Sequence, residues 1–366
     1  MTYALRYNTD VRESQQPLRV AVAGYGLAGS TFHAPLIAAT PGLAVAGIVT
    51  SDPERQLQAA SEYPGATVVG SVDEVWERSA EYDLVVVATP NHAHAPIARA
   101  AVDLGLAVCV DKPLATSAAE ARELVAYAAA RQVPLTVFQN RRWDSDQLTL
   151  RRLLSEGALG EVLRYESRFE RWRPDPKPGG VWRETRPPEE GGGTLLDLGS
   201  HLVDEALCVN GPATHVYAEI DSRRGGAADD DAFLALRHAN GAYSHLWASA
   251  MAAAPGPRLR VLGSRAAFVV ADVDGQEDAL SEGRRPGGGG EPWGREPAER
   301  WGRVVRGTEA EVVQSERGAW PEFYAGVERW LRAGGDPPVD PADAVRTLEL
   351  IEAARRSAAA GSTISL

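Results

Sequence analysis

The sequence of 366 residues predicts an α/β protein: an N-terminal domain with a doubly wound parallel sheet, then an α+β domain with a large, mostly antiparallel open sheet. Two patterns predict this fold class. Residues 18–138 alternate helical stretches with short runs that are apolar at consecutive positions, as in strands covered on both faces. From residue 214, strand-like segments follow one another with only turns between them, which indicates antiparallel pairing.

Five apolar runs are the expected strands of the first domain: 18–23, 43–50, 83–89, 107–112 and 134–140. The clearest helix between them, 116–132, opens with Ser117-x-x-Glu120, a pattern that caps a first helical turn. Alternating strands and helices predict parallel pairing with right-handed crossovers. We place this domain at residues 18–138, after an N-terminal extension of residues 1–17.

The second domain is placed at residues 139–320, with expected strands at 214–222, 231–239, 242–251 and 258–271. Residues 281–303, rich in Gly, Arg, Glu and Pro, are expected to form a mobile surface loop. Helices over 321–334 and 340–360 would form a C-terminal segment, 321–366. Helices on one face of an antiparallel sheet leave its other face for a second copy of the chain, so we expect a homodimer or homotetramer.

The composition excludes several classes of partner. A net charge of −12 argues against nucleic acid and anionic membrane surfaces, and no apolar run reaches the length of a membrane span. The first seventeen residues lack the apolar core of a signal peptide. Cys109 and Cys208 lie in apolar segments and are expected to be small core residues in a reducing compartment, so a cytoplasmic location is predicted.

The segment GYGLAG (24–29) fits G-x-G-x-x-G directly after the first strand and predicts a Rossmann dinucleotide site. Gly24 would permit the tight turn, Gly26 the approach of a pyrophosphate, and Gly29 the close packing of helix and strand. The other residues of the motif are also expected to contact the cofactor: Tyr25, Leu27 and Ala28.

The end of the second strand decides between NADP and NAD. An NAD site usually has an acidic residue about 20 positions after the glycines. Here Thr50 and Ser51 occupy that place and Arg55 follows, a set that suits a 2′-phosphate and favours NADP. Asp52 keeps NAD open, because a register slip of one residue would make it the ribose ligand.

Lys112 ends an apolar strand in AVCVDKPLATS (107–117), and the chain has one other lysine, Lys177. An ammonium can be tuned to release its proton and a guanidinium cannot, so Lys112 is a candidate catalytic group; the alternative is a capping or salt-bridging lysine. Asp197 and His201 have i, i+4 spacing on an expected helix. The carboxylate could hold the imidazole in one tautomer for use as a general base, or the pair could be an inert surface feature.

Taken together, these segments resemble the Gfo/Idh/MocA family, named for glucose–fructose oxidoreductase and inositol dehydrogenase. The resemblance rests on GYGLAG, ATPNHAH (88–94), Asp-Lys-Pro at 111–113, and the D-x-x-x-H of Asp197 and His201. Most relatives have Glu-Lys-Pro, so Asp111 is a departure. Within the family the chain is most similar to NADP-dependent scyllo-inositol dehydrogenases.

The resemblance implies an oxidoreductase that transfers a hydride between NADP or NAD and a secondary hydroxyl or ketone of a cyclitol, polyol or sugar. Some proteins of this fold only sense the nucleotide, so a silent regulator is the alternative function. Lys112, Asp197 and His201 match the catalytic residues, and the Lys112-Pro113 bond is expected to be cis. The resemblance implies further cofactor contacts from Thr89, Pro90, Asn91, His94, Asp111, Lys112, Pro113, Asn140, Trp182 and Arg183. It implies substrate contacts from Arg141, Trp172 and Arg173. No metal site is expected, because hydride transfer needs none.

Overall fold

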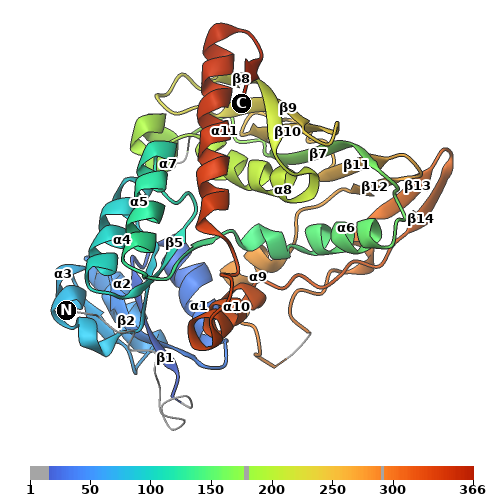
Figure 1. Cartoon of the computed structure of the whole chain (residues 1–366). Coiled ribbons are helices and arrows are strands. Elements are labelled where there is room, and N and C mark those ends of the chain that lie inside the picture. The colour runs from blue at the N-terminus through green and yellow to red at the C-terminus, as the bar shows by residue number, and fades with distance from the viewer. Residues whose placement is uncertain (1–15, 177–180, 290–291) are drawn as a thin grey trace.

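The computed structural model describes residues 16–176, 181–289 and 292–366, so most of the expected N-terminal extension lies outside the described residues. The first sheet is parallel, with strand order β3-β2-β1-β4-β5-β6. It forms the N-terminal half of the molecule, where β1, β2 and β5 are labelled in Figure 1. The chain reverses direction of winding between β1 and β4, which is where ligands bind in sheets of this kind. The strands are β1 (Leu18–Ala23), β2 (Leu43–Val49), β3 (Thr67–Val69), β4 (Leu84–Val87), β5 (Ala107–Asp111) and β6 (Leu135–Phe138).

The second sheet has the order β14-β13-β12-β11-β7-β10-β9-β8-β15, and of these neighbours β7 and β10 run parallel while the others are antiparallel. The predicted fold class is therefore confirmed. Its strands are β7 (Val162–Glu170), β8 (Ala213–Asp221), β9 (Asp231–His238), β10 (Tyr243–Ser249), β11 (Leu259–Gly263), β12 (Ala267–Val270), β13 (Arg303–Arg306), β14 (Glu309–Val312) and β15 (Ile364–Ser365).

Helices cover the first sheet and one face of the second. Two of them begin with a π-helical turn: η2 (Ala28–His33) leads into α1 (Ala34–Ala38), and η7 (Leu195–Gly199) leads into α8 (Ser200–Asn210). The remaining described α-helices are α2 (Pro53–Glu62), α3 (Asp73–Glu77), α4 (His94–Asp103), α5 (Ala118–Ala130), α6 (Ser145–Ser155), α7 (Trp182–Thr185), α9 (Gln276–Ser281), α10 (Pro321–Ala333) and α11 (Pro341–Ala360).

The expected helix caps are present. The Ser117 hydroxyl accepts from the Glu120 backbone N–H at 3.2 Å, and the Glu120 carboxylate accepts from the Thr116 N–H. Asp340 accepts from the Ala342 N–H at the start of α11. No helix in the described ranges is long and apolar enough to cross a membrane.

Two expectations about packing need correction. The described part of the expected loop, 281–289 and 292–303, is not simply a surface loop, because the Trp293 indole donates to Gln276 and the buried Glu296 carboxylate accepts from the Gly275 N–H. Cys109 is buried as expected, but Cys208 is exposed, because it lies on the outward side of α8. An apolar sequence neighbourhood does not fix the face that a helical residue occupies.

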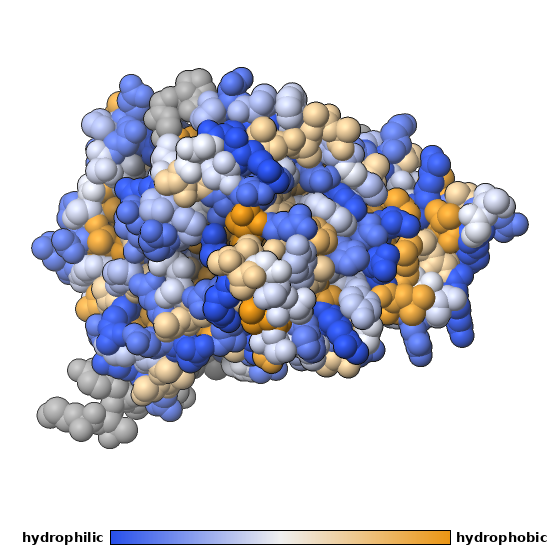
Figure 2. Space-filling model, turned by 90° about the horizontal axis from the view of Figure 1, so that it is seen from above, coloured by the Kyte–Doolittle hydropathy of each residue, from blue (hydrophilic) through white to orange (hydrophobic). Residues whose placement is uncertain are grey.

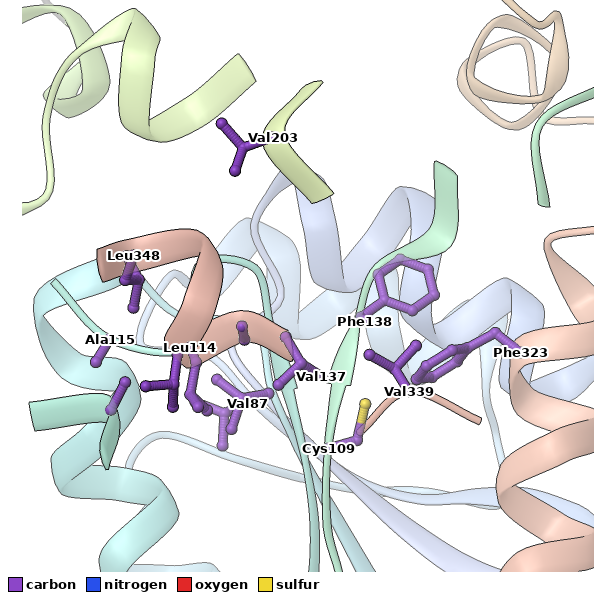
Figure 3. Close-up of a cluster of buried hydrophobic side chains, with 14 of the residues drawn as sticks. Val87, Cys109, Leu114, Ala115, Val137, Phe138, Val203, Phe323, Val339 and Leu348 are labelled. Carbon is purple, nitrogen blue, oxygen red and sulfur yellow. The ribbon is translucent and has the colours of Figure 1, made fainter. Parts of the chain in front are cut away.

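Helix α11 joins the two halves of the molecule, since it packs against α5 and β6 of the first and against β8 and α8 of the second. Figure 3 shows part of this core: Val87 and Val137 of the first sheet lie near Leu114, Leu348 of α11 lies near Ala115, and Val203 of α8 lies beyond. On the face seen in Figure 2, by contrast, hydrophobic residues are interspersed among hydrophilic ones. One hydrophobic core therefore runs through both sheets and fixes their relative position.

A buried charge network lies under α8. The Arg258 guanidinium is fully buried and contacts the Glu205 carboxylate at 2.6 Å, the Asp146 carboxylate at 3.3 Å and the Ser167 hydroxyl. Its carbon centre also lies 4.2 Å from the centroid of the Phe169 ring. Because Glu205 belongs to α8, this network sets the height of that helix above the sheet.

We predict that Arg258→Leu destabilises the protein by about 3–5 kcal/mol, because it leaves the carboxylates of Glu205 and Asp146 buried without their cation. Arg260→Leu, at the second residue of β11, is the matched control: its side chain is 44% exposed, and its partner Glu166 keeps a second cation, Arg168, so the loss should cost at most about 1 kcal/mol. Chemical denaturation followed by circular dichroism measures both. Equal losses of stability in the two variants would contradict the prediction.

Candidate active site

The glycine-rich turn between β1 and η2 has the geometry of a phosphate cradle. Gly24 has a φ of +105°, and a Cβ there would lie 2.6 Å from the Ala88 carbonyl oxygen. A Cβ on Gly29 would lie 1.9 Å from the Gly24 carbonyl oxygen. A Cβ on Gly26 would meet nothing nearer than an Arg55 nitrogen at 3.9 Å. The space over Gly26 is therefore open to a ligand, and these residues fit the pyrophosphate of a dinucleotide.

The other motif residues differ in exposure. Leu27 is 61% exposed at the mouth of the turn and Ala28 is buried at the start of η2. Tyr25 points inward, where its hydroxyl donates to the Glu62 carboxylate of α2 at 2.8 Å. The Tyr25 side chain thus fastens the turn to α2, and its backbone remains available to a ligand.

The residues after β2 bear on the choice of nucleotide. The Asp52 carboxylate caps α2, where it accepts from the backbone N–H groups of Glu54 at 3.0 Å and Arg55 at 3.3 Å. The Thr50 hydroxyl accepts from the Asp52 N–H, and Ser51 is exposed. The Arg55 side chain reaches back toward Gly26. Asp52 therefore has a structural role as a cap, while Arg55 lies beside the cradle.

Lys112 follows β5 and contacts the second half of the molecule. Its ammonium donates to the Asp197 carbonyl oxygen at 2.6 Å and to the Asp197 carboxylate at 2.8 Å. The Lys112-Pro113 peptide bond is cis, as the resemblance implied. The Arg183 guanidinium lies 3.4 Å from the same carboxylate. Burial would raise the pKa of Asp197, but Lys112 and Arg183 outweigh burial and hold it well below its usual range.

His201 lies nearby, but Asp197 does not orient it. Nδ1 of His201 is buried and has no hydrogen-bond partner among the described residues. Nε2 is not among the buried unpaired atoms, and no described residue bonds to it, so it is the ring nitrogen that a ligand can reach. The expected Asp197–His201 hydrogen bond is thus missing, because Lys112 and Arg183 are the charged partners that Asp197 takes.

The surroundings of His201 keep its imidazole neutral. The Phe169 ring packs against it with centroids 6.2 Å apart. Burial is the main cause that lowers the pKa of His201 well below its ordinary value, and the cations Lys112, Arg141 and Arg258 lower it further. At neutral pH the ring therefore carries an unprotonated nitrogen.

The loop after β4 fastens neighbouring segments together. Asn91 is buried and donates from its side-chain amide to the Gly191 carbonyl at 2.9 Å. The two ring nitrogens of His94 lie 2.7 Å from the Pro113 carbonyl oxygen and 2.8 Å from that of Thr89. Pro90 directly precedes the turn η4 (Asn91–Ala93). His94 is therefore placed to hold this loop against Lys112-Pro113, and its ring nitrogens are occupied by the protein itself.

The remaining candidates near the cofactor lie around Lys112. The Asp111 carboxylate accepts from the Lys112 backbone N–H at 2.7 Å, and its other oxygen lies 3.8 Å from the His33 ring. Asn140 is buried at the start of the turn after β6. Trp182 begins α7, and the Arg183 guanidinium stacks over its ring at 4.4 Å.

The three candidate substrate residues fall into two environments. Arg141 is buried and paired with Asp144 at 3.2 Å and Glu277 at 2.6 Å, so its guanidinium is already engaged by protein carboxylates. Trp172 is 55% exposed and Arg173 is exposed. A role for any of them in substrate binding stays a prediction.

Comparisons with known proteins agree with this architecture. Residues 18–139 match the model of the oxidoreductase family with an NAD-binding Rossmann fold, and residues 147–269 match that of the GFO/IDH/MocA C-terminal domain. The chain belongs to the Gfo/Idh/MocA family of oxidoreductases.

Relatives within the Gfo/Idh/MocA family match almost the whole chain. The uncharacterized oxidoreductase YdgJ of Escherichia coli is 38% identical over 95% of this chain and 99% of its own. The scyllo-inositol 2-dehydrogenase (NADP(+)) IolW of Bacillus subtilis is 33% identical over 97% of this chain and 98% of its own. The solved structure of yvaA from Bacillus subtilis superimposes with a TM-score of 0.89 at 32% identity, covering 96% of this chain and 99% of that one.

Two charged residues near the site were not anticipated from the family resemblance: Arg171 and Glu277. Arg171 directly follows β7, two positions after Phe169, and it lies within electrostatic range of Asp197 and Glu277. Glu277 lies in the first turn of α9 and forms an ion pair with Arg141. A two-residue alternation along β7 could have identified Arg171, because alternate residues of a strand share one face.

Proposed function

We propose that this chain is an NADP-preferring dehydrogenase or reductase acting on a secondary hydroxyl, or the matching ketone, of a cyclitol or sugar. The observation that carries the proposal is the Lys112 ammonium, held against Asp197 where β5 ends, with a neutral His201 beside it. The names of relatives such as IolW support a polyol substrate. The cytoplasmic location expected from the sequence remains part of the proposal.

A silent nucleotide-sensing regulator is the competing function. Such a protein needs the glycine cradle and has no use for a proton acceptor or an oxygen-polarising cation. The presence of Lys112, Asp197 and His201 together at one site therefore favours the enzyme.

Lys112 is assigned to polarise the reacting oxygen. An ammonium has three N–H donors, and Asp197 accepts from Lys112 through two oxygens, which leaves a donor for the substrate. The nicotinamide, when bound, supplies the hydride acceptor or donor. The glycine-rich turn fits that cofactor. The ion pair with Asp197 holds the Lys112 ammonium in position.

His201 is assigned to accept the hydroxyl proton during oxidation. A general base must be unprotonated, and the low pKa of His201 keeps it so. Its reachable Nε2 is the atom that would take the proton. Asp197 acts on this chemistry through Lys112, because the lysine is its hydrogen-bond partner.

The preference for NADP rests on the residues after β2. Asp52 is engaged at the helix cap and is thus poorly placed to bind a ribose diol. Arg55 lies beside the cradle, where a guanidinium pairs well with a 2′-phosphate.

Assembly through the second sheet is also proposed. One face of the sheet is covered by α8 and α11, while the other carries an aromatic cluster of Phe233, His245 and Trp247, with ring centroids 5.1–6.1 Å apart. The Arg168 guanidinium lies 3.8 Å from the Trp247 ring centroid. A partly buried aromatic cluster of this kind is typical of an interface between subunits, and supports a homodimer or homotetramer.

For the nucleotide, we predict a higher kcat/KM with NADP than with NAD. Arg55→Ala should lower kcat/KM for NADP by about tenfold or more, because charge-assisted hydrogen bonds contribute about 1.5–3 kcal/mol, and should leave the NAD value unchanged. Steady-state kinetics with both nucleotides measures this. A wild-type preference for NAD would refute the 2′-phosphate argument.

For catalysis, Lys112→Met and His201→Ala should each lower kcat by about 100-fold or more while NADP affinity is kept. Because the pKa of His201 lies well below 6.5, its base form persists on acidification, and kcat/KM for oxidation should keep its plateau as the pH falls through 6.5. The pH–rate profile measures this directly. An acidic limb centred at 6.5 would remove His201, as this structure holds it, from the role of base.

For assembly, light scattering of the wild type at micromolar concentration should report a dimer or tetramer. Trp247→Glu should produce monomers, because a carboxylate placed in the contact would be desolvated on association. Leu57→Glu is the matched control, since Leu57 is 75% exposed on α2, away from the sheet. A monomeric wild type would disprove the proposed interface.

A further inference from the structure

Arg171 stands out among the charged residues of the site because its guanidinium has no hydrogen-bond or ion-pair partner within the part of the chain that the structure describes. The backbone is fixed: the Arg171 N–H donates to the Ser249 carbonyl at 2.8 Å and its carbonyl accepts from Ala252 at 3.1 Å. The first bond continues the pairing of β7 with β10, so Arg171 shares the face of Phe169, whose ring packs against His201. The side chain is half-buried, yet it forms no hydrogen bond or ion pair with any described residue.

The carboxylates near Arg171 are engaged by other cations. Asp197 pairs with Lys112 and Arg183, while Glu277 and Asp144 pair with Arg141. Lys112, Arg141 and Arg183 are thus the cations that these three carboxylates pair with, and none of the three forms an ion pair with Arg171. Burial and the neighbouring Arg173 and Arg141 lower the pKa of Arg171, although Glu277 and Asp197 act against them. Arg171 therefore lies among cations and has no paired carboxylate of its own among the described residues.

A half-buried guanidinium without a paired carboxylate favours the binding of an anion. Half-burial removes part of its hydration, and a neutral hydroxyl would leave its charge uncompensated. A carboxylate accepts two parallel N–H bonds from a guanidinium and cancels the charge. Arg171 lies two residues after Phe169, whose ring packs against His201, so an anion bound to Arg171 would lie on the same face as the proposed reacting centre.

We propose that the substrate carries a carboxylate, which Arg171 binds, in addition to the secondary hydroxyl that reacts. This inference rests on the proposed function and narrows its substrate class to acidic sugars and polyols, such as hexuronates. Arg171 is then a specificity-determining residue: it selects for the carboxylate, and Lys112 and His201 act at the hydroxyl.

The test compares matched pairs that differ in the carboxylate: D-glucuronate with D-glucose, and D-galacturonate with D-galactose. Calorimetry on the full chain saturated with NADP measures binding, and steady-state kinetics measures turnover. The acidic member should be favoured by about 10- to 100-fold in the wild type, as expected for a charge-assisted hydrogen-bonded pair. Arg171→Leu should abolish this difference without changing affinity for NADP or the neutral sugar, and Arg171→Lys should retain part of it. Arg78→Leu, an exposed arginine at the end of α3, is the matched control and should behave as the wild type.

The outcomes separate this inference from the function on which it rests. Binding of the acidic sugars that depends on Arg171, without turnover, supports the carboxylate site and contradicts the proposed oxidation. Turnover of neutral and acidic sugars with equal kcat/KM supports the oxidation and overturns the carboxylate site. Equal weakening of both members by Arg171→Leu, or no binding of either acidic sugar, also overturns it.

Discussion

The ion pair between Lys112 and Asp197 is the contact on which the arrangement of the site depends. It joins the end of β5 in the first sheet to η7, the π-helical turn that leads into α8 on the second sheet. Both partners are partly withdrawn from water, and the lysine side chain is 13% exposed, so the pair is stronger than a surface salt bridge. The ammonium also bonds the Asp197 carbonyl, which ties its position to the backbone of the wide turn as well as to a side chain.

Several charged side chains are buried near this pair, although protein cores are usually apolar. Arg258 holds Glu205 of α8, and Arg141 holds Asp144 and Glu277. Such networks are costly to bury and are retained where geometry must be kept. Burial is the main cause that lowers the pKa of His201, and Arg258, which holds α8, lowers it further together with Arg141 and Lys112. Arg258 therefore supports both the fold and the proposed proton acceptor.

The features that the sequence predicted are those that depend on local rules. Gly24 and Gly29 are required by close backbone approaches, and the caps at Ser117 and Asp340 involve neighbouring residues, so each is legible in a short segment. The strand β7 was missed because charged residues alternate with its buried ones, which hid an interior strand behind a polar composition.

Within the site, the choice of partner could not be read from spacing. Asp197 and His201 are four residues apart, but the partner of the Asp197 carboxylate was decided by Lys112, which is 85 residues away in the chain. Arg171 was overlooked for the same reason. Among the described residues it has no ion-pair partner because the nearby carboxylates pair with other cations, and spacing along the chain does not reveal this. Helical spacing indicates which residues are close enough to form a hydrogen bond. Whether the bond forms depends on charged residues from distant parts of the chain that compete for the same partner.

The segments around Lys112 are fastened by the protein alone. His94 holds the loop after β4 to Pro113, and Asn91 holds that loop to Gly191, which precedes η7. A neutral imidazole has one N–H, so only one of the two carbonyls that face His94 can accept from it at a time. Burial lowers the pKa of His94 and opposes a second proton. One of the two carbonyl contacts of His94 therefore lacks a proton, while the other holds the loop after β4 next to Lys112-Pro113. Since donors that are already in position need no reorganisation when charge develops, this bracing is what would let one ammonium act on a substrate oxygen.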